Sequence, residues 1–112
     1  MPVHNTGNVQ ITGIFYNGAG SQEPDEYVDI QNQESFSIQL QSWTLRDAAN
    51  HVYTFPNFVM QSGQVCRVYT NENHPEWCGF NYNSGSAIWN NTGDTATLRD
   101  GNGSLIDTYT YP

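Results

Sequence analysis

The stretch from Trp43 to Gln64 places the tightest constraint on how this chain can fold. Trp43 and Leu45 alternate with polar residues, and the segment Tyr53–Phe55 repeats that alternation after a short Ala-Ala-Asn turn. Alternation on both sides of a tight turn predicts a β-hairpin with one apolar face. Pro56 lacks a backbone donor, so the second strand must stop there or lie at a sheet edge. An apolar face this dense needs a second layer to cover it.

Shorter segments with the same period of two occur along the rest of the chain. Val9 and Ile11 alternate with polar residues, Gly13 interrupts, and Ile14 and Tyr16 resume on the opposite parity, which predicts a β-bulge. No segment shows a sustained apolar period of 3.6, so helices should be absent or minor. Strands at short intervals with turn signals between them predict an all-β sandwich or barrel of about seven to nine mostly antiparallel strands.

Several pieces of the sequence, in order, carry a family resemblance. The clearest are W-T-L-R-D from Trp43, Y-T-F-P-N-F from Tyr53, S-G-Q-V from Ser62 and I-W-N-N-T-G-D from Ile88. Together with smaller matches they extend over roughly 9–111, nearly the whole chain. In this order they resemble the lamin tail domain family, and their Asn-rich character is similar to the bacterial members.

The resemblance implies an immunoglobulin-like β-sandwich that serves as an interaction module. In similar proteins the domain is appended to filament rods in animals and to secreted or surface enzymes in bacteria. We therefore predict a flexible leader at residues 1–8 and a lamin-tail-like sandwich at 9–112. The predicted function is non-catalytic: a protein-interaction or cell-surface attachment module, taken from a larger secreted or surface protein. The predicted location is extracellular or at the cell surface, with a protein or surface component as partner.

The charge of the chain argues against nucleic acid as a partner. Only 12% of residues are charged, three arginines and no lysine face eleven acidic residues, and the net charge is -8. Such a surface repels a phosphate backbone. No apolar run approaches the length needed to cross a membrane, and the residues before Val9 do not resemble a signal peptide.

The two cysteines, Cys66 and Cys78, are predicted to form a disulfide, and two other readings stay open. Cys66 lies in an expected strand and Cys78 follows a polar turn, so a returning chain could bring them within disulfide distance. Such a bridge would stabilise the fold by roughly 2–3 kcal/mol and would suit an oxidising compartment. A pair of reduced thiols is the second reading. A zinc site with His74 is the third, but it lacks a fourth ligand and any paired C-x-x-C.

The remaining polar residues suggest little chemistry. Asp25 and Glu26 belong to the densest run of carboxylates, where calcium could bind weakly, although such runs are more often a solvated face. The histidines have no mutual spacing typical of a catalytic pair or a metal site, and the serines lack a strand-turn-helix setting. We therefore predict no catalytic residues, no resident metal and no cofactor.

Aromatic residues support an alternative function. They make up 13% of the chain, and Trp77, Tyr82 and Tyr109 are hard to place in a core. Exposed aromatic rings among Asn and Gln are typical of carbohydrate-binding sandwiches. The competing interpretation is that these rings pack with their apolar bodies and leave only polar tips in water. The three residues are therefore candidate ligand-facing aromatics, and a carbohydrate-binding module is the alternative prediction.

Overall fold

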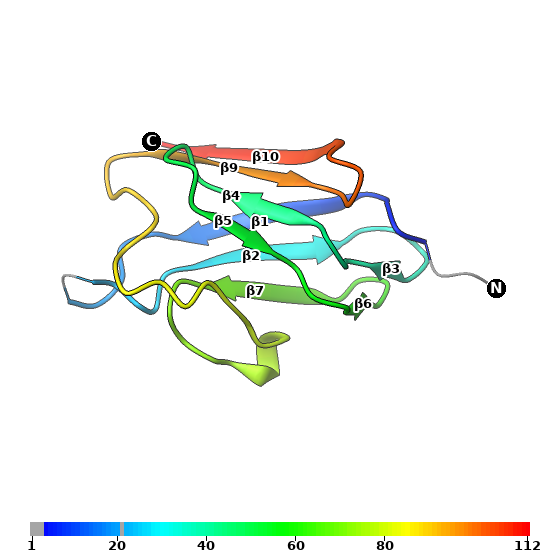
Figure 1. Ribbon diagram of the computed structural model, residues 1–112, viewed down its shortest axis with the longest axis horizontal. Coiled ribbons are helices and arrows are strands. Elements are labelled where there is room, and N and C mark those ends of the chain that lie inside the picture. The colour runs from blue at the N-terminus through cyan, green and yellow to red at the C-terminus, as the bar shows by residue number, and fades with distance from the viewer. Residues whose placement is uncertain (1–3, 21) are drawn as a thin grey trace.

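The computed structural model describes residues 4–20 and 22–112, which form two packed β-sheets (Figure 1). The first sheet has the order β1 (Val9–Phe15), β2 (Tyr27–Asn32), β7 (Val65–Tyr69) and β8 (Phe80–Asn81). The second has the order β10 (Leu105–Tyr111), β9 (Asp94–Arg99), β4 (Thr44–Arg46) and β5 (Val52–Thr54). A two-stranded ribbon pairs β3 (Ile38–Gln39) with β6 (Val59–Met60). The predicted all-β, immunoglobulin-like sandwich is confirmed.

Strand pairing is antiparallel except for β7 and β8, which run parallel. A single 3₁₀ turn, η1 (Pro75–Trp77), is the helical structure of the described residues, as the lack of a 3.6 period predicts. Within residues 4–20 and 22–112, no helix has the length and apolar character to cross a membrane.

The predicted central hairpin is present as β4 and β5. Leu45 pairs with Tyr53 in this hairpin, and β5 ends at Thr54, before Pro56. Trp43 is completely buried, and its indole Nε1 donates a hydrogen bond to the carbonyl of Asn5 at 3.1 Å. The core between the sheets combines these residues with apolar side chains of the first sheet, including Val28, Ile30, Cys66 and Val68.

The predicted bulge in the first strand is also present, because the register of β1 against β2 shifts between Ile11 and Gly13. At this irregularity the amide of Ile11 donates to Asp107 Oδ2 on β10, at 2.8 Å. The edges of the two sheets therefore meet along one side of the sandwich. An inward-pointing carboxylate there occupies a backbone donor that would otherwise be open to another strand.

A buried carboxylate fastens the long segment between β8 and β9. Glu26 is completely buried, and its Oε1 accepts hydrogen bonds from the Thr70 hydroxyl at 2.9 Å and from the amides of Ile88 and Trp89 at 2.9 and 3.3 Å. Burial raises the pKa of Glu26 against the opposing effect of these donors. Figure 1 shows this segment, in yellow, running along one end of the sandwich.

Part of the segment expected as a flexible leader is hydrogen-bonded to the sandwich. Residues 1–3 lie outside the described residues. His4 forms a parallel β-bridge with Ile38, and the carbonyl of His4 accepts from the amide of Gln39 at 2.7 Å. Thr6 Oγ1 donates to Asp100 Oδ2 at 2.9 Å. The described part of the segment therefore packs with the domain that was expected to begin at Val9.

Candidate functional site

The outer face of the second sheet carries an unusual set of side chains for so acidic a chain. Alternate residues of each strand point away from the core, because Leu45, Ala96 and Leu98 are buried and their neighbours are not. The register places the outward residues in rows across the four strands. We call this surface the threonine face, and it consists of Thr44, Arg46, Val52, Thr54, Thr95, Thr97, Arg99, Leu105, Thr108 and Thr110. It contains two of the three arginines and no carboxylate.

The carboxylates nearest this face are engaged elsewhere. Asp47 is buried and accepts from the amide and the ring Nδ1 of His51, both at 2.7 Å. Asp94 is also buried and accepts from the amides of Ala48, Thr95 and Asn90 at 3.0, 2.8 and 3.3 Å. Neither is left to balance Arg46, and no ion pair to this arginine is found among residues 4–20 and 22–112.

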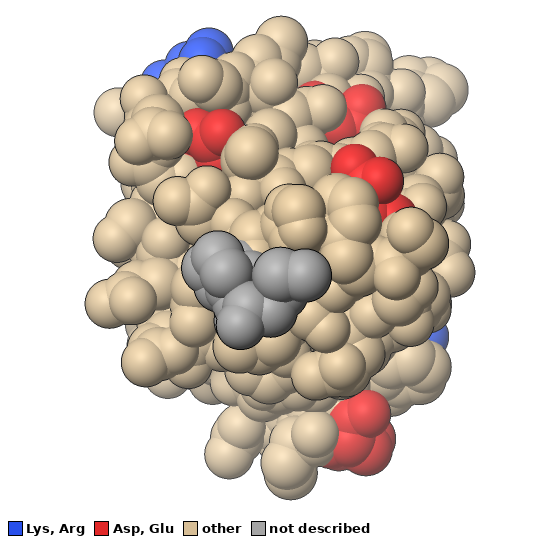
Figure 2. Space-filling view, turned by 90° about the vertical axis from the view of Figure 1, so that its right-hand side faces the viewer, with Lys and Arg blue, Asp and Glu red and all other residues tan. Residues whose placement is uncertain are grey.

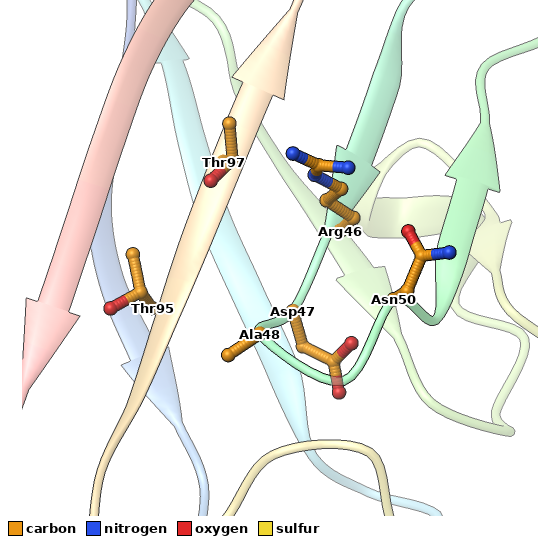
Figure 3. Close-up of a pocket in the computed structure, with 6 residues that line it drawn as sticks. All are labelled: Arg46, Asp47, Ala48, Asn50, Thr95 and Thr97. Carbon is orange, nitrogen blue, oxygen red and sulfur yellow. The ribbon is translucent and has the colours of Figure 1, made fainter.

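Arg46 lies beside an open hollow of about 410 Å³ on the threonine face (Figure 3). The hollow is lined by Arg46, Asp47, Ala48, Asn50, Thr95 and Thr97. In Figure 3 the carboxylate of Asp47 points away from the guanidinium of Arg46. Guanidinium, amide and hydroxyl groups therefore line the hollow together with the Asp47 carboxylate, whose oxygens are bonded to His51. An anionic or hydrogen-bond-accepting group is what the guanidinium, amide and hydroxyl groups would bind.

The outer face of the first sheet is organised differently. Four side chains stack in the order Phe15, Tyr27, Arg67, Trp77, and we call this row the aromatic ladder. The Phe15 and Tyr27 ring centroids are 5.4 Å apart. The Arg67 guanidinium lies 4.1 Å from the Tyr27 centroid on one side and 3.9 Å from the Trp77 ring on the other.

Arg67 has protein partners at its edges as well as on both faces. Its Nε donates to Asp29 Oδ1 at 2.9 Å, directly across from it in the register, and its NH1 donates to the Tyr69 hydroxyl at 3.3 Å. The group is therefore held by four neighbours of its own chain. Such an arrangement stabilises the sheet and leaves little of this cation for a ligand.

The predicted disulfide joins Cys66 on β7 to Cys78 just after η1. It closes the loop that carries Trp77 and His74. His74 stacks on Tyr69 with ring centroids 4.2 Å apart, and its ring nitrogens face Glu72 at 2.7 Å and Glu76 at 3.2 Å. The hydrogen bond to Glu72, and then that to Glu76, raises the pKa of His74. The disulfide therefore fixes the base of the loop, and the stacking of His74 on Tyr69 holds the loop against β7.

The three candidate ligand-facing aromatics occupy different environments. Trp77 stands on the aromatic ladder of the first sheet, half-buried. Tyr82 reaches to the second sheet, where its hydroxyl donates to the Leu45 carbonyl at 2.9 Å, and burial raises its pKa. Tyr109, on β10, pairs with the buried Ala96 and packs against the core. The structure therefore gives Tyr82 and Tyr109 partners within the fold.

The two residues considered for calcium also have partners within the fold. Glu26 is the buried anchor described above, and Asp25 Oδ1 accepts from the amide of Ala19 at 2.8 Å. No group of three or more His, Cys, Asp or Glu side chains positioned to hold a metal occurs in the described part of the chain. The Asp25 carboxylate therefore crosslinks its own loop, from Asp25 back to Ala19.

Sequence reasoning did not single out Arg46, Arg99 or the threonine rows. The signal in the sequence is a threonine at every second position, at Thr95 and Thr97 and again at Thr108 and Thr110. This spacing marks outward positions on two strands. What the sequence does not show is that these strands are neighbours and that both arginines share their face.

A family model described as Lamin Tail Domain matches residues 2–112. A search of curated proteins finds no match.

Proposed function

The chain belongs to the lamin tail domain family, and on that premise we propose that it is a non-catalytic module that binds a protein partner. The observation that carries this proposal is the family match over residues 2–112, since the family is one of immunoglobulin-like interaction domains. The threonine face adds support, because its Arg46 stands beside an open hollow and has no ion pair among the described residues.

We further propose that the module belongs to a secreted or cell-surface protein. The disulfide between Cys66 and Cys78 supports this, because such bonds persist in oxidising compartments and are rare in reducing ones. Most of the atoms on the face in Figure 2 belong to residues that are neither acidic nor basic, with acidic groups in isolated patches. Polar, uncharged side chains keep such a surface soluble despite few charges.

The experiment compares ligand classes on the same protein. Peptides selected from a phage-displayed random library, soluble polysaccharides in affinity gels and a DNA duplex are each offered to the domain. We expect peptides that bind saturably, and no retardation by polysaccharides or DNA. Retardation by a polysaccharide that disappears in Trp77→Ala, without loss of thermal stability, would establish the carbohydrate-binding alternative and overturn the proposal.

A further inference from the structure

We infer that the free edge of β5, next to the Arg46 hollow, receives an extended peptide segment that carries a glutamate. The segment would add a fifth strand to the second sheet and place its carboxylate on Arg46. This inference rests on the proposed function, because it names where an interaction module would bind and what chemistry it would recognise. Strand addition supplies affinity through main-chain hydrogen bonds and specificity through alternate side chains.

The backbone of β5 defines the edge. The amide of Phe55 donates to Trp43 at 2.8 Å and that of Asp47 donates to the carbonyl of His51 at 3.4 Å, so residues 51, 53 and 55 direct their backbone groups toward β4. Alternate residues of an antiparallel strand point their N–H and C=O groups to opposite sides. Val52 and Thr54 therefore turn theirs outward, away from the sheet.

The other edges of the sandwich are less suited to an added strand. β1 and β10 lie against each other, and Asp107 of β10 occupies the outward amide of Ile11. β8 is two residues long. β5 is also short, since Pro56 has no N–H to extend the ladder, so main-chain bonds alone cannot hold a peptide tightly.

Side chains beside the β5 edge would supply the remaining affinity for the peptide. Val52 is 48% exposed and would pack against an apolar residue of the added strand. Arg46 stands directly across from Val52 in the register. Neighbouring strands are about 4.8 Å apart, so the added strand would lie roughly 10 Å from the Arg46 backbone. A glutamate and an arginine can span that distance with their side chains.

The charge distribution selects an occupant with few carboxylates. Arg46 has no ion-pair partner among the described residues, so it would attract a carboxylate brought close to it. The whole chain carries a net charge of -8 and would repel a strongly acidic segment. At physiological ionic strength charges beyond about 8 Å are largely screened, so the nearby arginine decides the interaction with a single glutamate.

The test uses the peptides selected on the 112-residue chain. We expect them to carry a glutamate and a β-branched residue two positions apart, so that both side chains lie on the face of the added strand that continues the threonine face. Arg46→Gln should weaken their binding roughly tenfold, the usual loss when a carboxylate loses its hydrogen-bonded cation, as measured by calorimetry. Arg99→Gln removes a cation from the same face, farther along the sheet, and should change binding by less than about twofold.

Backbone pairing is tested on the peptide, where folding of the protein is not at issue. Two peptides are made, one methylated on the amide nitrogens of the odd-numbered residues and the other on those of the even-numbered residues. One should lose binding and the other keep it, because only alternate N–H groups face β5. Equal effects in the two peptides would overturn strand addition. Val52→Pro, with thermal unfolding as its control, should abolish binding as well.

Failure of this inference can be told from failure of the proposed function. Peptides that bind Arg46→Gln and Val52→Pro as tightly as the original chain would leave an interaction module with its site elsewhere. Selection of no peptide at all would overturn both. A dimer in sedimentation velocity that the peptides dissociate would assign the β5 edge to a second copy of the chain, and would overturn the proposed occupant.

Discussion

The two outer faces of the sandwich use arginine in opposite ways. On the aromatic ladder, Arg67 has a ring on each side, a carboxylate on one edge and a hydroxyl on another. On the threonine face, Arg46 is exposed and has no ion pair within the described residues. A scarce cation in an acidic chain can therefore either stabilise its own sheet or remain available to a partner, and the residue type alone does not reveal which.

The largest expected loss of stability comes from the core that both faces share. Trp43→Ala removes a completely buried indole and its hydrogen bond to Asn5, and should lower the free energy of unfolding by roughly 3–5 kcal/mol. Chemical denaturation measures this. A loss below about 1 kcal/mol would show that the hairpin is not the organising element of both faces.

The disulfide is expected to matter mainly to the ladder side. Replacing both Cys66 and Cys78 by alanine opens a crosslink with a sequence separation of 12, and should cost roughly 2–3 kcal/mol. Urea unfolding of the double variant, compared with the oxidised original chain, checks the value, and the original chain under a phosphine reductant should lose a similar amount. Two free thiols in the original chain after purification under oxidising conditions would contradict the bridge itself.

A matched pair of substitutions tests the comparison directly. Arg67→Met keeps the aliphatic stem but removes two cation–aromatic contacts and an ion pair, and should cost roughly 1–2 kcal/mol. Arg46→Met should change stability by less than about 0.5 kcal/mol, as is usual for an exposed residue without partners. Equal costs would mean that Arg46 has a structural role, and the contrast between the faces would fail.

The smallest expected effect is a pH dependence of the stability that His74 contributes in the loop between β7 and β8. The pKa of His74 is raised in the folded state by Glu72 and then by Glu76. The stabilisation is therefore fully present below the unfolded pKa of about 6.5 and is lost as the pH rises through the folded pKa. Proton NMR titration of the ring should give a midpoint above about 6.5 that falls more in Glu72→Gln than in Glu76→Gln. The reverse order would show that Glu76, and not Glu72, is the main partner of His74.

Much of the fold could be predicted because it depends on local alternation. The hairpin of β4 and β5 and the bulge at Gly13 are confirmed, since inward and outward residues are distinguished by a period of two over several positions. β3, β6 and β8 are two residues long, too short to show a period. The ribbon and the parallel pairing of β8 with β7 depend on contacts between distant segments.

The candidate surfaces were harder to predict than the fold. Tyr82 looked exposed by its polar neighbours, but its hydroxyl finds the carbonyl of Leu45, 37 residues away in the chain. The row that joins Thr97 to Arg46 exists only because β9 pairs with β4, which no local pattern specifies. By contrast, the bridge between Cys66 and Cys78 was predictable, because only a short loop separates them.

The placement of the arginines also affects how readily trypsin-like proteases cleave the folded domain. Trypsin-like enzymes cut after lysine or arginine, and the chain has no lysine. All three arginines belong to strands: Arg67 lies inside β7, and Arg46 and Arg99 are the last residues of β4 and β9. A strand cannot enter such an active site unless its sheet opens, so cleavage after Arg67 follows the unfolded population, and cleavage after Arg46 or Arg99 requires at least that the strand end frays. Outside a cell, the folded domain would thus outlast any lysine-rich linker joined to it.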